Sequence, residues 1–159
     1  MKTAQPLKRN PALVRFSQDH HYALLCVWKI REGLRKTVSA ERISRYVLHF
    51  FETDLQHHLT EEEEKVFAKL PKDNAMRIEA QEQHKEIFLL VKELKQNPGD
   101  RNLLENFADT LEKYIHFEER RLFHYLQQVL SDNELDRISK TTVSAVHEPE
   151  EAWSDVFWK

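Results

Sequence analysis

Apolar residues recur every three or four positions along four long stretches of the chain, which is the pattern of α-helices with one buried face. The fourth stretch shows the pattern clearly, with Leu104, Phe107 and Leu111 on one face and mostly polar residues between them. A fifth, shorter stretch follows near the C-terminus. We predict helices at residues 12–36, 40–69, 74–96, 101–130 and 132–146.

The residues between these stretches are those that end and start helices. Asn97-Pro98-Gly99-Asp100 is the clearest break, and Ser131 with Glu134 three residues later fits a capping box. Two glycines and five prolines suit long helices better than sheets, whose turns consume both. Short connections between long amphipathic helices predict an all-α fold, an antiparallel up-down-up-down four-helix bundle. We expect one domain of 159 residues, with the bundle at about 12–130 and a short C-terminal helix and tail at 131–159.

Polar residues interrupt each of the four apolar stripes at one place. The residues at these places, one or two per helix, are His20, His58, Glu62, His84 and Glu118. Measured from a common end of an antiparallel bundle, they lie within about four residues of one depth, roughly 6 Å at the helical rise. Every helix of the predicted bundle therefore brings a side chain that can bind a metal ion to the same level of the core.

Buried carboxylates and imidazoles need partners, and a cation on the bundle axis would satisfy all of them at once. A single histidine on an apolar face is more commonly a hydrogen-bonded core residue, but five such residues at one depth favour a metal site. Carboxylate with imidazole suits iron, manganese or zinc. His58 and Glu62 are four residues apart and share one helix face, so both can reach the same centre.

Several neighbouring residues are alternatives or are set aside. His20 fits its stripe better than the adjacent His21, and His58 fits better than His57. We expect the rest of the acidic run at 61–64 to be a solvated face. We also expect Cys26 to pack in the core, and the aromatic tail to cover an end or side of the bundle or to dock a partner. Three further histidines lie off the stripes and are read as surface or lining residues: His49, His124 and His147.

Composition and charge narrow the classes of protein that remain. The chain has 24 Lys and Arg against 27 Asp and Glu, a net charge of −3, which argues against nucleic-acid binding. Its polar balance and lack of a long apolar run argue against a membrane protein. Cys26 is the single cysteine, so no disulfide forms within one chain, and the first residues lack a signal peptide's apolar segment. We expect a cytoplasmic protein.

The sequence resembles the hemerythrin-like family, the cation-binding domains named for a His-His-Glu pattern. The matching stretches are SQDHHYALLCVWKI, HHLTEEEEKVFAKLP, EQHKEI and YIHFEERRLF. The resemblance implies an antiparallel four-helix bundle with a non-haem metal centre, usually two irons with histidine ligands and bridging carboxylates. Carried over residue by residue, it implies the ligands already named, His20, His58, Glu62, His84 and Glu118.

One position departs from the family pattern. Four residues before the last glutamate the family usually has a histidine, but this chain has Tyr114, and His116 lies two residues further on. Two residues on a helix turn by about 200°, so His116 should face away from the centre. Tyr114 has three possible roles: core packing, direct phenolate ligation, or hydrogen bonding to the site. The number of nitrogen ligands, and with it the number of metal ions, depends on this position.

These observations lead to a functional expectation with two rivals. We expect a protein with a non-haem di-iron centre that binds or senses dioxygen or another small diatomic molecule or peroxide, or handles iron and oxidative stress. One rival is an enzyme with such a centre, a di-iron oxidase, peroxidase or nitric-oxide-handling catalyst. The other is a metal-free helical interaction module, for which the sequence identifies no protein partner.

Overall fold

The computed structural model describes residues 8–143, 147 and 152–159, and its regular structure is helical throughout. The helical elements are α1 (Pro11–Arg35), α2 (Ala40–Phe50), η1 (Phe51–Leu55), α3 (Gln56–Glu61), η2 (Glu62–Val66), η3 (Phe67–Lys69), α4 (Ala75–Gln96), α5 (Arg101–Phe117), η4 (Glu118–Leu122), α6 (Phe123–Val129) and α7 (Asp132–Thr141). Three of them, η1, η2 and η4, are single turns of π-helix inside longer helical runs, and η3 is a 3₁₀ turn.

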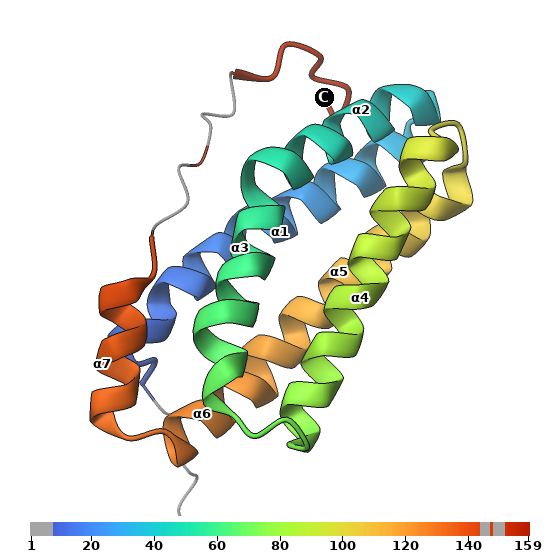
Figure 1. Cartoon of the computed structure of the whole chain (residues 1–159). Coiled ribbons are helices and arrows are strands. Elements are labelled where there is room, and N and C mark those ends of the chain that lie inside the picture. The colour runs from blue at the N-terminus through green and yellow to red at the C-terminus, as the bar shows by residue number, and fades with distance from the viewer. Residues whose placement is uncertain (1–7, 144–146, 148–151) are drawn as a thin grey trace, which may run out of the picture.

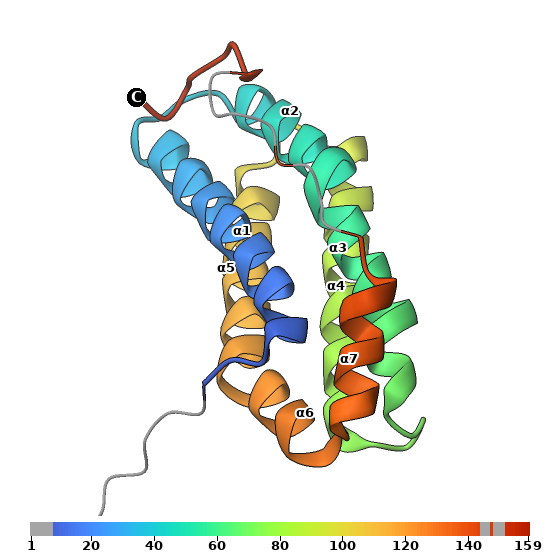
Figure 2. The same cartoon turned by 90° about the vertical axis from the view of Figure 1, so that its left-hand side faces the viewer.

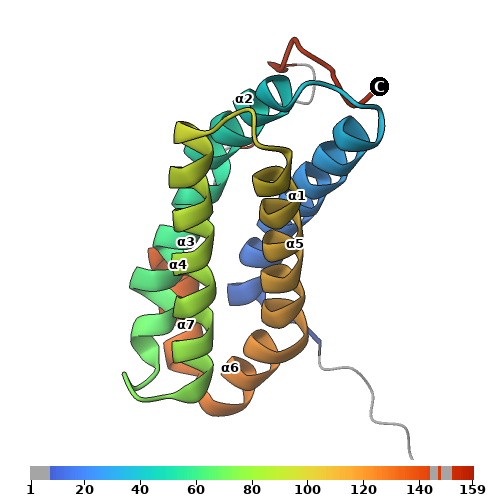
Figure 3. The same cartoon turned by 90° about the vertical axis from the view of Figure 1, so that its right-hand side faces the viewer.

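The long runs form the predicted antiparallel four-helix bundle. In Figure 1, α1 rises, α2 and α3 descend, α4 rises again, and α5 and α6 descend. α1 packs against α2 and α5, and α4 packs against α5 and α2, so each run lies beside its neighbours in sequence. Figure 3 shows α4 and α5 side by side along their length. The all-α prediction is confirmed. No helix among the described residues has the length and apolar character needed to span a bilayer.

The helices begin where polar side chains satisfy their first amide groups. The residues that cap them in this way are Asn10, Ser39, Asn74, Asp100 and Ser131. At Ser131 the capping box is complete, because the side chain of Glu134 also accepts a hydrogen bond from the Ser131 amide. The breaks between helices therefore follow the sequence closely.

The core consists of two apolar clusters with a layer of buried polar residues between them. One cluster includes Ala23, Leu59 and Ile87, and the other includes Phe16 and Ala80, each at the opposite end of the bundle. The polar layer falls where the apolar stripes are interrupted. This arrangement places the polar residues of all four helical runs at one depth, with apolar packing above and below them.

The last predicted helix is shorter than expected. It ends at Thr141 rather than at residue 146, and Thr142 has an extended backbone with ψ of 144°; residues 144–146 lie outside the described part. The run Thr141-Thr142-Val143 is β-branched, which disfavours helix. Arg15 from α1 also donates hydrogen bonds to the Thr142 carbonyl and hydroxyl oxygens, and His57 bonds the Val143 carbonyl at 3.0 Å. α7 packs on α1 and η2 (Figure 2).

The aromatic tail covers one end of the bundle, as expected. Phe157 and Trp158 are buried against α1 and α2, and Trp158 also lies 4.1 Å from the ammonium group of Lys29. Gly33 on α1 makes room for this packing, because a Cβ atom there would lie 2.8 Å from the Phe157 ring. Trp28, by contrast, is 50% exposed and is not part of this buried packing.

Candidate metal centre

Six of the residues singled out in the sequence meet in the polar layer. They are His20 on α1, His58 on α3, Glu62 at the start of η2, His84 on α4, Tyr114 on α5 and Glu118 at the start of η4. None of the six is more than 3% exposed. The competing histidines lie outside this group, since His21 is exposed and His57 and His116 are only partly buried.

Both glutamates stand at the first position of a π-helical turn. The Glu62 carbonyl accepts a hydrogen bond from the Phe67 amide, and the Glu118 carbonyl accepts one from the Phe123 amide, in each case five residues on. Single π turns inside α-helices are frequent at functional sites. The wider turn begins in both helices at the carboxylate that faces the bundle axis.

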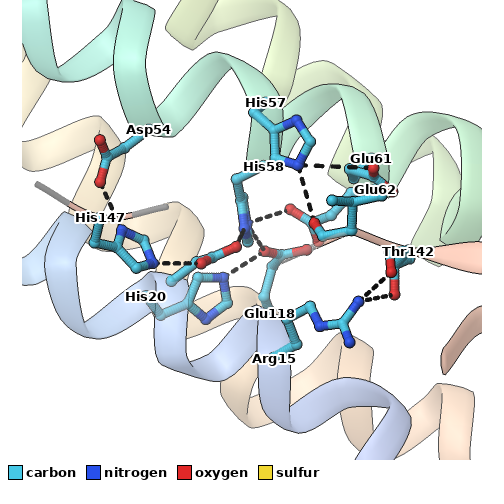
Figure 4. A network of polar contacts seen from close by, with 12 residues as sticks. Arg15, His20, Asp54, His57, His58, Glu61, Glu62, Glu118, Thr142 and His147 are labelled. Atoms are coloured by element: carbon cyan, nitrogen blue, oxygen red, sulfur yellow. Dashed lines mark hydrogen bonds and ion pairs between the residues drawn. The ribbon is translucent and has the colours of Figure 1, made fainter. Parts of the chain in front are cut away.

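Four of the residues converge most tightly. His20 Nε2 lies 2.8 Å from Glu118 Oε1, and His58 Nε2 lies 2.6 Å from Glu62 Oε1. His58 Nε2 is also 3.7 Å from Glu118 Oε1. One nitrogen or oxygen atom from each of the four falls within 4.8 Å of all the others, a spacing at which a single metal ion could bind them together (Figure 4).

His84 and Tyr114 adjoin this cluster at Glu62. The Tyr114 hydroxyl donates a hydrogen bond to Glu62 Oε1 and lies 2.8 Å from His84 Nε2 and 3.5 Å from His58 Nε2. His84 Nε2 is 3.6 Å from the same Glu62 oxygen. Glu62 is therefore in contact with both the cluster and the His84–Tyr114 pair.

A second ring of carboxylates holds the outer nitrogen of each histidine. Glu119 is 2.8 Å from His20 Nδ1 and Asp19 is 3.0 Å from His58 Nδ1. Glu63 is 3.0 Å from His84 Nδ1. A carboxylate that accepts the Nδ1 proton fixes the tautomer and ring orientation and leaves the Nε2 lone pair directed inward, which is the arrangement typical of metal-binding histidines.

These outer carboxylates were not among the site residues predicted from the sequence. The acidic run at 61–64, apart from Glu62, was expected to be a solvated face. This holds for Glu64 and is wrong for Glu61, whose side chain is 14% exposed; Glu63 is 37% exposed but also bonds to His84. Asp19, Glu63 and Glu119 each stand next to a candidate ligand in sequence. An acidic residue directly beside an inward-facing residue was the available signal, but such a neighbour lies off the apolar stripe from which the ligands were predicted.

A comparison with models of protein families shows to which family the chain belongs. The model of the hemerythrin HHE cation-binding domain matches residues 16–126, more than half of the sequence. The chain belongs to the hemerythrin family. The matched range includes all six residues of the polar layer. No curated protein and no solved structure matched the chain.

A hemerythrin domain binds metal cations, and the donor atoms of this layer suit one. Glu62 Oε2 and Glu118 Oε2 are buried and have no hydrogen-bond partner. A buried carboxylate oxygen without a partner costs free energy, and a bound cation would remove that cost. The cluster of His20, His58, Glu62 and Glu118 can therefore hold a metal ion.

The metal-free histidines of this hemerythrin domain are poised to be protonated. Burial alone would lower the pKa of His84, but hydrogen bonds to Glu62 and Glu63 raise it to about 9. Burial also opposes protonation of His20 and His58, yet Glu118 and Glu119 raise the pKa of His20, and Glu62 and Asp19 raise that of His58. In the absence of metal, protons supply the positive charge that the carboxylates require.

The two inner carboxyls and the phenol respond differently to burial. Burial and the nearby charge of Glu62 raise the pKa of Glu118. For Glu62 burial acts in the same direction, but the charge and hydrogen bonds of His58 outweigh it and hold the pKa well below its usual value. Burial and the two glutamates raise the pKa of Tyr114 far above its usual range. Without a cation beside it, Tyr114 therefore remains a neutral hydrogen-bond donor.

Proposed function

We propose that this hemerythrin-family protein holds a non-haem di-iron centre that binds or senses dioxygen or a similarly small molecule, or that handles iron under oxidative stress. The residues that would hold the metal are His20, His58, Glu62, His84, Tyr114 and Glu118. Bound iron would supply redox chemistry and a coordination position for the small molecule. The chain supplies rigid donors and a core closed by apolar packing on both sides.

The unpartnered inner oxygens carry the proposal. Glu62 and Glu118 each keep one buried oxygen without a partner in the middle of three histidines whose outer nitrogens are already bonded to carboxylates. A packed polar core with no ligand would satisfy these oxygens from within the protein. Imidazole and carboxylate donors match the preferences of iron, although manganese and zinc share them.

The contacts of Glu62 support two metal positions. His20 and His58 contact the inner glutamates at 2.8 and 2.6 Å, whereas His84 and Tyr114 contact each other at 2.8 Å and both approach Glu62 Oε1. Glu62 contacts both pairs, as a carboxylate shared between two metal ions would. The second position has one imidazole and one phenol where the family usually has two histidines, so we expect it to bind iron more weakly than the first.

Metal analysis of a matched pair of variants tests this function. Glu62→Gln removes an inner carboxylate, whereas Glu64→Gln makes the same change at an exposed position two residues away. After anaerobic iron loading, the parent and Glu64→Gln should each hold about two iron ions and gain thermal stability, since binding to the native state stabilises it. Glu62→Gln should lose most of its iron. A parent that takes up no metal, or equal losses in the two variants, would contradict the proposal.

A further inference from the structure

His147 reaches the polar layer from beyond the end of α7. Its Nδ1 lies 2.6 Å from Asp54 Oδ2 and its Nε2 lies 2.8 Å from Asp19 Oδ1. Its ring stacks on Tyr22 with 3.8 Å between the ring centres. Figure 4 shows the imidazole directed toward the Asp54 carboxylate. His147 was expected to be a surface or lining residue, and in the structure it lines a cavity at the flank of the site.

The imidazole forms one wall of a small cavity that borders the candidate ligands. His20, His58 and Tyr114 line the inner side of the cavity, and Asp19, Asp54 and His147 line it as well. The space open to the centre of a water molecule is about 10 Å³. A volume of this size holds about one water molecule. A molecule that reaches the centre from this side must therefore be very small.

Two acidic side chains, Asp19 and Asp54, lie beside His147 on this side of the site. Asp19 and Asp54 are each about one-tenth exposed, and His147 bonds to both of them. Removing the imidazole would enlarge the cavity and leave two carboxylates along its wall without their shared partner. Such a wall would repel anions while leaving uncharged molecules unaffected.

We propose that His147 is a specificity-determining residue, which narrows access on this side of the centre and slows even molecules of two non-hydrogen atoms, while Asp19 and Asp54 exclude anions. The proposal rests on the di-iron function proposed above. It assigns the imidazole a role in selecting which small molecules reach the metal, through its bonds to Asp19 and Asp54. Asp19 bonds both His147 and His58, so it fixes the position of the His147 imidazole relative to a candidate ligand.

His147→Ala tests this role, with His124→Ala on α6 as the matched control because His124 does not line the cavity. Each iron-loaded protein is mixed in a stopped-flow instrument with nitric oxide in the ferrous state and with azide in the ferric state. We expect nitric oxide to associate at least tenfold faster with His147→Ala than with the parent, and azide to associate no faster. His124→Ala should match the parent with both probes.

Asp54→Asn gives a second test if His147→Ala folds poorly, because the Asp54 carboxylate bonds the His147 imidazole and the Thr53 hydroxyl and is not one of the candidate ligands. It should accelerate nitric oxide binding severalfold. Iron content, measured first, separates the two hypotheses: a parent without iron contradicts the di-iron function and the inference with it. Nitric oxide rates within twofold of the parent for a loaded His147→Ala or Asp54→Asn, or equal acceleration of nitric oxide and azide by His147→Ala, would overturn the inference alone.

Discussion

Each candidate histidine is held at both of its ring nitrogens, one facing the centre and the other facing a carboxylate. Glu119 illustrates the support behind one of them, since it accepts from His20 and is itself held by Arg9 at 2.9 Å. The outer carboxylate orients the ring and increases its basicity toward a metal. These outer residues are thus expected to affect metal binding without touching the metal.

Glu119→Gln should weaken iron binding by about tenfold, because an amide still fills the space but carries no charge to support the His20 ring. Competition with a chelator of known affinity measures the change. Glu105→Gln, an exposed position on α5, is the control and should leave the affinity unchanged. An affinity for Glu119→Gln equal to that of the control would show that the outer ring has no influence on the site.

Tyr114→Phe tests the residue that departs from the family pattern. A cation next to the phenol favours its anionic form, despite the burial that raises its pKa in the metal-free protein. We therefore expect the ferric parent to show a visible charge-transfer band that Tyr114→Phe abolishes. Tyr125→Phe is the control, since that hydroxyl bonds Asn74 at the end of the bundle. An unchanged band in Tyr114→Phe would rule out direct ligation.

At the scale of the helices, the packing around Gly33 leaves no room for a larger side chain. A methyl group at Gly33 would lie 2.8 Å from the side chains of Ile43 and Phe157, whereas at Gly99 it would meet the flexible end of Glu41. Overpacking costs about 1–3 kcal/mol, and alanine gains at most about 1 kcal/mol over glycine in a helix.

Gly33→Ala should therefore lower the free energy of unfolding by about 1 kcal/mol net, while Gly99→Ala should be neutral or slightly stabilising. Urea denaturation of the two metal-free variants measures both effects. A more stable Gly33→Ala would mean that the tail moves aside at no cost and does not fix the end of the bundle.

The helices were predictable to the extent that local chemistry determines them. Caps such as Asn74 and Asp100 and the interrupted stripes indicated the helix starts and the common depth of the polar layer. The π turns at Glu62 and Glu118 were not predictable, because one wider turn barely disturbs a stripe of apolar residues. The position of His147 was also beyond local reasoning, since it depends on contacts with residues more than ninety positions away in sequence.

For the molecule as a whole, the raised pKa values of the histidines link stability to pH when metal is absent. A group whose pKa is higher in the folded protein stabilises it below its ordinary pKa, near 6.5, and loses this effect as the pH rises through the folded value. For His84 that value is about 9, and the corresponding contribution is on the order of 3 kcal/mol.

The free energy of unfolding of the chelated protein should therefore fall between pH 7 and 9.5, when measured with urea in a series of buffers. The iron-loaded protein should lose much less over the same range, because metal ions replace the protons. An equal decline in the two forms would mean that the histidines of the polar layer do not titrate as their surroundings indicate.

The ring formed by Asp19, Glu63 and Glu119 has an electrochemical consequence. Together with Glu62 and Glu118 it surrounds the centre with five carboxyl groups, and among the described residues an arginine bonds one of the outer three, Glu119. A concentration of negative charge favours the metal state with the higher positive charge. Bound iron is thus expected to have a low reduction potential, and replacing an outer carboxylate by its amide should raise the midpoint in a spectroelectrochemical titration. The outer carboxylates that orient the imidazoles would then also determine how readily the metal gives up an electron.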